Sequence, residues 1–457
     1  MHLFSAYSTE KLSVINIGFS TFSSLFHLQI MVSTDADKLP TSEELLFFLN
    51  FQSREKFSTK LTDTTNTTIS INLFSENERV VKQMKIICDT AAMNEAASNV
   101  QRAVASKAVN PALEGIYIKP TGQGVELCGF DTDVGITTLI SADSAEGGGT
   151  VINAKTFCDI IRHLPARKMS IETDEKNKCV IRSGDAEYTL MGIPENTYPE
   201  LPFVTGGTPM ILPQEILKNM IRQVIFAVSL DDSKTVHKGV KFEIREGEMT
   251  LAALDGYRLA VRHEAIDYTG DPISFIAPSK TLSEVVKLIN DDEGFVSVNL
   301  DKKHIIFGLN GYNIVSGLLE GDFIDYRRTI PQKFETAVIV NTQDMTDSID
   351  RISLLITERF KTPVKCVVDS EQNEIRFLSS NTIGSANDRI SADVEGVSIV
   401  KGFNSRYLSD AFRAVDTERM RIMLNPAAVD PACIYPIEGD RYFYMILPVR
   451  LPDEQAK

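Results

Sequence analysis

Lysine and arginine side chains recur along this chain at a spacing that could bind a polyanion. Lys155, Lys280 and Arg406 stand about 125 residues apart, and each opens a segment whose apolar residues follow the period of an amphipathic helix. Seven positions later each segment has a second basic residue, on the same helical face and opposite the apolar stripe. We therefore expect these charges to point away from the core. The residues of this set are Lys155, Arg162, Lys280, Lys287, Arg406 and Arg413.

An earlier helical segment is predicted in each copy of the pattern, again with a basic residue on its far side. Arg102, Arg222 and Arg351 fall at matching positions of these segments, and Lys218 lies one helical turn before Arg222. Lys and Arg side chains bind the phosphate backbone of nucleic acids without reading the base sequence. The two sets of helices together predict a sequence-independent surface for a polyanion.

A simpler explanation exists for any single one of these residues, because a solvated helix face is usually charged. This explanation is weaker for Lys155, Lys280 and Arg406, which lie at helix N-termini. A cation at the positive end of a helix dipole costs roughly a few tenths of a kcal/mol. The same unfavourable placement in three copies favours a binding role.

The overall charge argues in the opposite direction. The chain has 62 acidic and 47 basic residues, and its net charge of −15 is typical of proteins that do not bind nucleic acid. A basic surface can still exist if it is segregated from an acidic exterior. The repeated placement of the basic residues outweighs the composition.

Nothing in the sequence predicts a catalytic residue, a metal site or a cofactor. The histidines lie far apart, and no nucleotide-binding or hydrolase motif is present. Asp255 could act as an acid, but Asp-Gly between two strands is more often a turn. The scattered cysteines indicate reduced thiols in a cytoplasmic protein, and no apolar run is long enough to span a membrane.

The repeat divides most of the chain into three domains, at 84–206, 207–331 and 332–457. In each of them a helix, a run of alternating strands, a second helix and further strands follow one another, which predicts an α+β fold with two helices packed on antiparallel sheets. Residues 1–83 lie outside the repeat. We expect them to be a disordered extension or a mis-called start, with a genuine accessory segment as the alternative.

Three segments of the chain carry a resemblance to a known family. They are 252–261 (AALDGYRLAV), 321–328 (GDFIDYRR) and 444–451 (YMILPVRL). In this order and at this spacing, they resemble the beta subunit of bacterial DNA polymerase III, the sliding clamp. The resemblance covers residues 84–451.

The resemblance implies a DNA sliding clamp, a processivity factor without catalytic activity. Three repeated clamp domains would assemble head to tail with a second subunit into a homodimeric ring around duplex DNA. The implied partners are the DNA polymerase III alpha subunit, the clamp-loader complex, and other clamp-binding polymerases and repair proteins. No membrane is implied.

The resemblance also assigns residues to sites. Lys107 and Arg328 would contact DNA, and the dimer would join Tyr188 and Leu190 to Leu354 and Leu355. A hydrophobic pocket between the second and third domains would take a short peptide with leucine and phenylalanine anchors. The implied pocket residues are His237, Leu254, Gly256, Tyr257, Arg258, Leu259, Ile324, Thr329, Leu447, Pro448, Val449, Arg450 and Leu451.

Some residues depart from the family pattern. His237 stands where an aliphatic residue is usual, Leu254 and Thr329 also differ, and the chain continues as 452–457 beyond the usual terminus. Two other classes of function compete with the clamp. A repeat-built enzyme of nucleic-acid metabolism would need a carboxylate or histidine cluster for a metal, and a scaffold that binds only proteins would not depend on DNA topology.

Overall fold

Two separate units make up the computed structural model, Met1–Lys82 and Gln83–Lys457. In the first unit the structure describes the backbone of five strands, which pair antiparallel in the order β1-β2-β3-β5-β4. The expectation for residues 1–83, a disordered extension or a mis-called start, falls largely outside the described residues and stays a prediction. The strands are β1 (His2–Thr9), β2 (Leu12–Thr21), β3 (Ser24–Ser33), β4 (Ser58–Thr62) and β5 (Thr68–Ser75).

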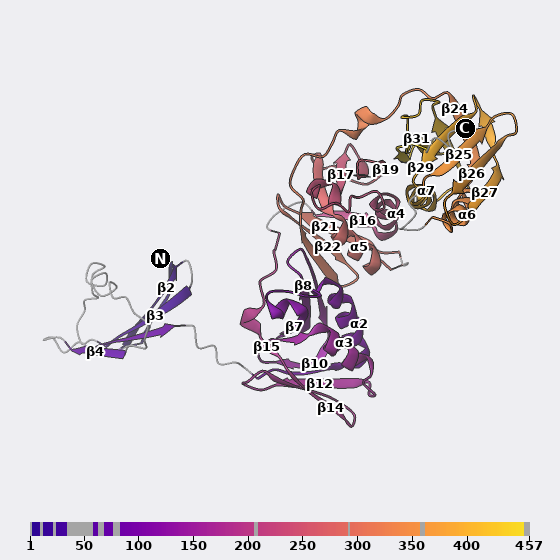
Figure 1. The fold of residues 1–457 in the computed structure, drawn as a ribbon. Coiled ribbons are helices and arrows are strands. Elements are labelled where there is room, and N and C mark those ends of the chain that lie inside the picture. The colour runs from indigo at the N-terminus through magenta and orange to yellow at the C-terminus, as the bar shows by residue number, and fades with distance from the viewer. Residues whose placement is uncertain are drawn as a thin grey trace. The chain divides into compact units, whose positions relative to one another are not determined.

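One arrangement of strands and helices occurs three times in the second unit, of which the structure describes residues 83–204, 209–290, 293–356 and 362–451 (Figure 1). The first copy contains β6 (Lys85–Asp89), α2 (Thr90–Val100), β7 (Gly115–Thr121), β8 (Gly124–Phe130), β9 (Val134–Ile140), β10 (Ala142–Glu146), β11 (Thr150–Asn153), α3 (Ala154–Arg162), β12 (Lys168–Thr173), β13 (Lys178–Ser183), β14 (Ala186–Met191) and β15 (Ile193–Pro194). The second contains β16 (Met210–Pro213), α4 (Gln214–Ile225), β17 (Gly239–Arg245), β18 (Glu248–Leu254), β19 (Arg258–Ala265), β20 (Ile273–Pro278), α5 (Ser279–Leu288), β21 (Phe295–Leu300), β22 (His304–Leu309) and β23 (Tyr312–Gly317). The third contains β24 (Thr336–Asn341), α6 (Thr342–Ser353), β25 (Val364–Asp369), β26 (Glu374–Ser380), β27 (Ser385–Ser391), β28 (Asp393–Glu395), β29 (Ile399–Phe403), α7 (Ser405–Ala414), β30 (Arg419–Leu424), β31 (Ala432–Pro436) and β32 (Tyr442–Ile446).

The helices form where the apolar stripes predicted them. Asp89, Asn153, Asn341 and Asn404 cap four of the helices, because each side chain accepts hydrogen bonds from backbone N–H groups of the first turn. The stripe residues are buried or half-buried, and the two helices of each copy pack against each other. The predicted α+β class, with paired helices on antiparallel sheets, is confirmed. Among the described residues, no helix is long and apolar enough to cross a membrane.

Two nine-stranded sheets run from one copy into the next. One has the order β15-β11-β7-β8-β9-β23-β22-β21-β16, and the other has the order β20-β17-β18-β19-β32-β31-β30-β24-β28. We call the β9–β23 pairing the first joint and the β19–β32 pairing the second joint. Two shorter sheets end in β14 and β27, which have no strand beyond them among the described residues. The backbone thus joins the three copies and leaves one strand edge at either end.

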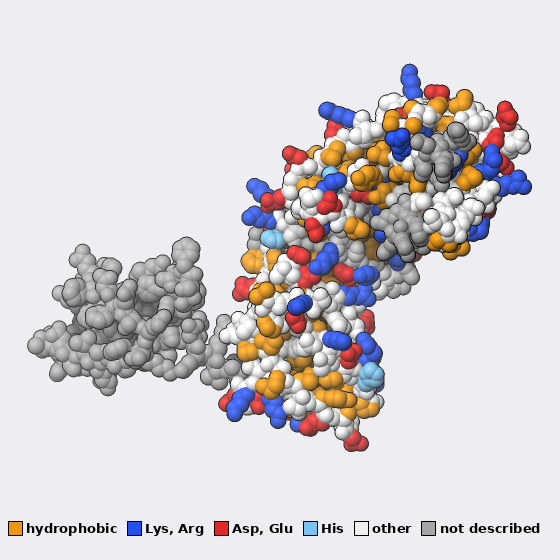
Figure 2. Space-filling view, viewed as in Figure 1, with side chains coloured by type: hydrophobic (Ala, Val, Ile, Leu, Met, Phe, Trp, Pro, Cys, Tyr) orange, Lys and Arg blue, Asp and Glu red, His pale blue; other side chains and the backbone are white. Residues whose placement is uncertain are grey.

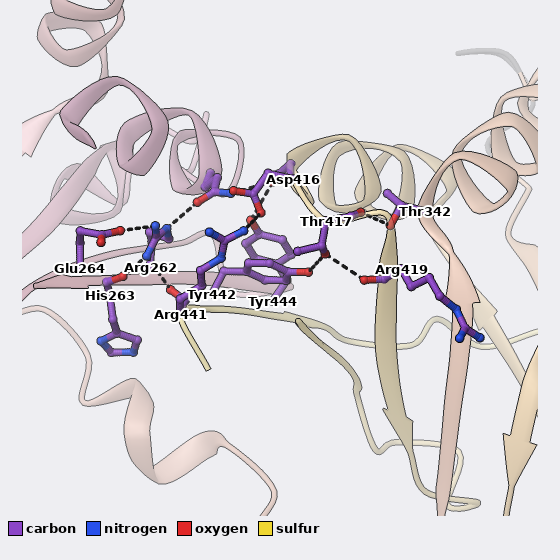
Figure 3. A network of polar contacts seen from close by, with 12 residues as sticks. Arg262, His263, Glu264, Thr342, Asp416, Thr417, Arg419, Arg441, Tyr442 and Tyr444 are labelled. Carbon is purple, nitrogen blue, oxygen red and sulfur yellow. Dashed lines mark hydrogen bonds and ion pairs between the residues drawn. The ribbon is translucent and has the colours of Figure 1, made fainter. Parts of the chain in front are cut away.

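A buried arginine holds the second joint together (Figure 3). Arg262 on β19 is 5% exposed, and its Nε donates to Gln223 Oε1 of α4 at 2.6 Å. Its Nη1 reaches the carbonyl of Arg441, next to β32, at 3.2 Å. The amide of Gln223 in turn donates to the carbonyl of Ala414 at the end of α7. One guanidinium therefore links a helix of the second copy to the strand and helix of the third.

We expect Arg262→Ala to destabilise the second joint. Removing one partner of a buried charged network leaves the others without hydrogen bonds, which costs roughly 3 kcal/mol. The melting temperature should fall by several degrees. Arg245→Ala removes an exposed arginine from β17 and should change it by no more than about a degree. Equal melting temperatures for the two variants would contradict this role of Arg262.

Candidate nucleic-acid and partner interfaces

Basic side chains on the helices point to solvent, as the helical spacing predicted. The structure exposes all of them apart from Lys218, which is half-buried. Arg102 differs from the prediction in one respect. Helix α2 ends at Val100, so Arg102 lies in the short 3-10 turn Gln101–Ala103 that follows it. The exposed residues on the helices and this turn are Arg102, Lys155, Arg162, Arg222, Lys280, Lys287, Arg351, Arg406 and Arg413.

Carboxylates neutralise much of this charge. Lys280 Nζ lies 2.5 Å from Asp131 Oδ2, which belongs to the first copy, so this lysine contributes to the first joint. The ion pair therefore gives Lys280 a structural reason to lie at a helix N-terminus, in addition to any contact with DNA. The other close pairs on the helices are Arg162–Asp159, Lys287–Glu284, Arg351–Asp388 and Arg413–Asp350. The surface is basic, but only weakly so.

Three basic residues of the helical set have no carboxylate within 4 Å among the described residues. They are Arg102, Lys155 and Arg222. Their charges are the least compensated, and we expect them to contribute most to any attraction for phosphate.

Lys107 and Arg328 lie apart from the helical set. Lys107 is exposed in the loop after the 3-10 turn, next to Ala108, which packs on the sheet face opposite the helices. Its contact with DNA stays a prediction. Arg328 follows Tyr326 in the 3-10 turn Tyr326–Thr329, and Tyr326 is buried on that same opposite face. The linker carries Arg328 past the sheet face opposite the helices, and its contact with DNA, like that of Lys107, stays a prediction.

An apolar cluster covers the outer face of the second joint. Residues on β18 and β19 alternate, so Leu254 and Leu259 face outward whereas Ala253 and Ala260 face the helices. The linker between the second and third copies passes over the outward side chains. We call this group the outer cluster: Ala252, Leu254, Leu259, Val261, Tyr326, Cys433, Phe443 and Met445, with Phe323, Ile330, Phe334, Met423 and Tyr435 packed against it. Figure 2 shows hydrophobic side chains gathered over β17, β19 and β31.

Arg258 fixes one rim of the outer cluster. Its guanidinium pairs with Asp255 at 3.0 Å and with Asp410 of α7 at 2.6 Å, and lies 4.4 Å from the ring centre of Tyr407. Tyr257 stacks on Tyr407 at 6.3 Å and is 58% exposed. Asp255 Oδ1 also accepts the backbone N–H groups of Tyr257 and Arg258, which confirms the turn at this position. The contacts of Tyr407 and Asp410 with Arg258 were not predicted from the sequence, because both residues lie on a helix that the sequence assigned to nucleic-acid binding.

The chain end forms the opposite rim. Leu447 donates its N–H to the carbonyl of Tyr257, and Val449 donates to that of Gly402, both at 2.9 Å. A side chain at Gly402 would meet the Val449 oxygen at 2.6 Å, so glycine is needed for the tail to lie this close. The other predicted pocket residues apart from His237 lie on the turn, the linker and the tail around the outer cluster. They are Gly256, Ile324, Thr329, Pro448, Arg450 and Leu451.

His237 stands at the edge of the outer cluster. Its ring meets that of Phe323 edge to face at 5.9 Å. Burial, followed by the charge of Lys234, lowers the pKa of His237, so the imidazole is neutral near pH 7. The structure thus brings His237, Leu254, Leu259 and the tail to one surface.

No chemistry beyond binding is evident at these surfaces. Among the described residues no group of His, Cys, Asp and Glu side chains could hold a metal ion. Burial raises the pKa of the Cys88, Cys128 and Cys179 thiols to about 12, so these thiols stay protonated and are poor nucleophiles.

Comparison with known proteins agrees with the arrangement of three copies. Three family profiles match in order: the N-terminal domain of the DNA polymerase III beta subunit at 84–202, the central domain at 211–325 and the C-terminal domain at 327–450. The beta sliding clamp of Bacillus subtilis is 31% identical over 80% of this chain and 100% of its own length. The chain belongs to the DNA polymerase III beta subunit family.

Solved structures of this family have the same fold. A DNA polymerase sliding clamp from Bacillus subtilis superposes with a TM-score of 0.76 at 30% identity, over 81% of this chain and 100% of the other. The beta subunit from the DNA polymerase of Streptococcus pyogenes gives a TM-score of 0.74 at 29% identity, over 80% and 100%. The shared fold covers the repeated unit.

The residues expected at a dimer contact lie beside β14 and β27, which are edge strands of the two shorter sheets. Tyr188 and Leu190 are on β14, beside a shallow pocket that α3 also lines. Leu354 and Leu355 follow α6, which packs against β27, and the carbonyl of Leu355 accepts from Asn381 Nδ2 at 2.7 Å. Leu354 is 81% exposed. Apolar side chains are thus present at both edges.

We expect the double variant Arg102→Ala and Arg222→Ala to bind duplex DNA more weakly and with a smaller salt dependence. Each phosphate contact contributes about 0.9 to the slope of log K against log salt concentration, so the slope should fall by about that amount for each phosphate that the variant no longer neutralises. The measurement is fluorescence anisotropy of a labelled duplex at several salt concentrations. Arg245→Ala with Lys302→Ala removes the same charge away from the helices and serves as the control. If both pairs change the slope equally, the effect belongs to net charge and not to the helical surface.

Proposed function

We propose that this chain is a processivity clamp, which closes around duplex DNA as a head-to-tail dimer and tethers replication proteins through the outer cluster. The observation that carries the proposal is the repetition of one joint within the chain, together with the edge strands β14 in the first copy and β27 in the third. The three domains that we propose are 84–206, 207–331 and 332–457.

The strand β27 occupies the same place in its copy as β9 and β19 do in theirs. Each of the three follows a turn in which one side-chain oxygen accepts hydrogen bonds from two backbone N–H groups. The accepting side chains are those of Asp131, Asp255 and Asn381. Each also packs against the first helix of its copy. Likewise β14, β23 and β32 are each the last strand of a hairpin at the end of a four- or five-stranded half-sheet. The edges of β27 and β14 therefore match the two sides of a third joint.

The in-chain joints define a register for that third joint. Tyr312 pairs with Thr138, and Tyr442 pairs with Arg262. Each tyrosine is the first residue of the last strand of its copy, and Ala186 is the first residue of β14. Thr138 and Arg262 each lie seven positions after the side chain that accepts in the preceding turn, and Asp388 lies at the same distance from Asn381. The same counting pairs Glu187 with Asn387 and Tyr188 with Ala386.

A ring contact in the second joint supports the expected apolar contact between subunits. Phe226, just after α4, meets Tyr444 of β32 edge to face at 5.3 Å. Aligned on Arg222 and Arg351, Phe226 corresponds to Leu355, and Tyr444 corresponds to Tyr188. We therefore propose that Leu355 of one subunit packs on Tyr188 of the next, in the shallow pocket beside α3.

A head-to-tail contact repeated in two subunits closes into a ring when its rotation allows. The basic helices would then face enclosed DNA, and their partly neutralised charge would hold phosphate weakly enough to permit sliding. Retention would be topological. The outer cluster would bind peptides of the DNA polymerase III alpha subunit, the clamp loader and other clamp-binding polymerases and repair proteins. Within the family this is a non-catalytic role.

We expect clamp loaded on closed circular DNA to stay bound until the circle is cut. A ring without tight contacts leaves DNA only over a free end, so cutting with a restriction enzyme should release it within minutes. The measurement is the fraction that co-elutes with DNA in gel filtration before and after linearisation. Equal loss from both forms would remove the encirclement mechanism. A nuclease or phosphatase turnover in the same preparation would instead favour the enzymatic alternative.

We expect Glu187→Cys and Asn387→Cys, introduced together, to form a disulfide between subunits. Both positions are exposed in the isolated chain and would lie opposite each other in the proposed register. Mild oxidation should give a covalent dimer on a non-reducing gel. The pair Glu187→Cys and Arg389→Cys is two residues out of register and serves as the control. Equal cross-linking by both pairs would contradict the register.

A further inference from the structure

One aromatic side chain of the linker sits among the residues proposed to bind partner peptides. Phe323 is half-buried against the outer cluster, with its ring edge to face with His237 at 5.9 Å and with Tyr326 at 6.4 Å. The ammonium of Lys241 lies 5.7 Å from the ring centre. The ring thus has an apolar floor, two aromatic walls and a cation above it, which is the environment that an aromatic anchor of a peptide would need.

Two polar atoms against this ring lack hydrogen bonds. Nδ1 of His237 and the hydroxyl of Tyr326 are buried and have no hydrogen-bond partner among the described residues. An unpaired buried polar atom costs about 1–3 kcal/mol, so the conformation with Phe323 in this place carries a penalty. A ligand group that reached either atom would relieve this penalty.

The segment around Phe323 lies outside the sheets, between β23 and the 3-10 turn Tyr326–Thr329. Gly321 has a φ of +134°, a conformation that favours glycine, and the neighbouring Asp322 and Ile324 are exposed. Tyr326 anchors the linker, since it is buried in the outer cluster. Between Gly321 and Tyr326 the Ile324 carbonyl accepts a hydrogen bond only from the nearby Tyr326 N–H, so among the described residues no hydrogen bond of the sheets depends on the place of Phe323.

We propose that Phe323 occupies, in the unbound chain, the place that an aromatic side chain of a partner peptide takes, and that peptide binding displaces it. The inference rests on the proposed function of the outer cluster and names the ligand class of that site, a short peptide with an aromatic anchor. Phe323 then sets the affinity threshold, because a peptide must compete with a side chain that is always present.

The first test compares peptide affinities. The probe is an acetylated decapeptide that ends in leucine and phenylalanine, with a matched peptide that ends in leucine and alanine. If the site is free in about a tenth of the molecules, Phe323→Ala should tighten binding of the first peptide roughly tenfold. Phe334→Ala removes another half-buried phenylalanine of the same linker and cluster, and should not tighten it.

The outcomes separate this inference from the proposed function. Weaker or unchanged binding by Phe323→Ala, with normal binding by the wild type, would show that Phe323 is a wall of the site and would overturn the inference alone. If neither the wild type nor the variants bind the peptide, the outer cluster is not the partner site, and the proposal for Phe323 falls with it. Discrimination between the two peptides should be largest in Phe323→Ala.

The second test follows the side chain itself. The chain has no tryptophan, so Phe323→Trp gives a single fluorescent reporter at this position. Displacement into solvent should shift its emission to longer wavelength as the peptide is added, with a midpoint equal to the dissociation constant. A shift to shorter wavelength, or none at saturation, would show that the ring stays in place and would overturn the inference. Phe295→Trp, an exposed position on β21 outside the outer cluster, is the control and should not respond.

Discussion

Backbone hydrogen bonding between strands of different copies is the constraint on which this structure depends. At each joint an edge strand finds its partner in the next copy, so a sheet of one copy continues into a sheet of the next. Such pairing satisfies groups that an isolated copy would leave exposed. The two joints share one register, and the proposed dimer would pair β14 with β27 in the same way. The proposed assembly would then use the same interaction that joins the copies within the chain.

Charge in this protein is arranged in keeping with sliding. An acidic chain with fully exposed lysines along its helices would bind any polyanion at low salt. Here Asp350 and Asp388 pair with Arg413 and Arg351, while Arg102 and Arg222 have no such partner among the described residues. Coulomb attraction remains, but its strength per contact is reduced. A protein that is held by its topology needs no stronger contact.

The sequence predicted what depends on local pattern. The stripes through Phe157 and Leu408, and caps such as Asn404, determine the helices and hence the exposed basic residues. It could not predict the pairing of Tyr312 with Thr138, since strand partners far apart in the chain are chosen by packing. The ion pair of Lys280 with Asp131 depends on that pairing and was hidden for the same reason. The sheet face beside which Arg328 lies was hidden as well, because a linker has no periodicity that shows which face of a sheet it crosses.

Comparison of the two joints explains why an apolar binding surface is expected at only one. The backbone arrangement is the same at both joints. After β23 the N–H of Leu319 donates to the carbonyl of Ile276, and after β32 the N–H of Val449 donates to the carbonyl of Gly402. Yet Gly135 stands where the second joint has Leu259, and Leu201 of the linker fills the space in front of it. The exposed rim position has Asp133 at the first joint and Tyr257 at the second. A linker crosses the sheet at both joints, so the rim makes the difference. A charged rim gives an apolar peptide little surface to bury, whereas an exposed tyrosine beside a neutralised arginine offers both area and orientation.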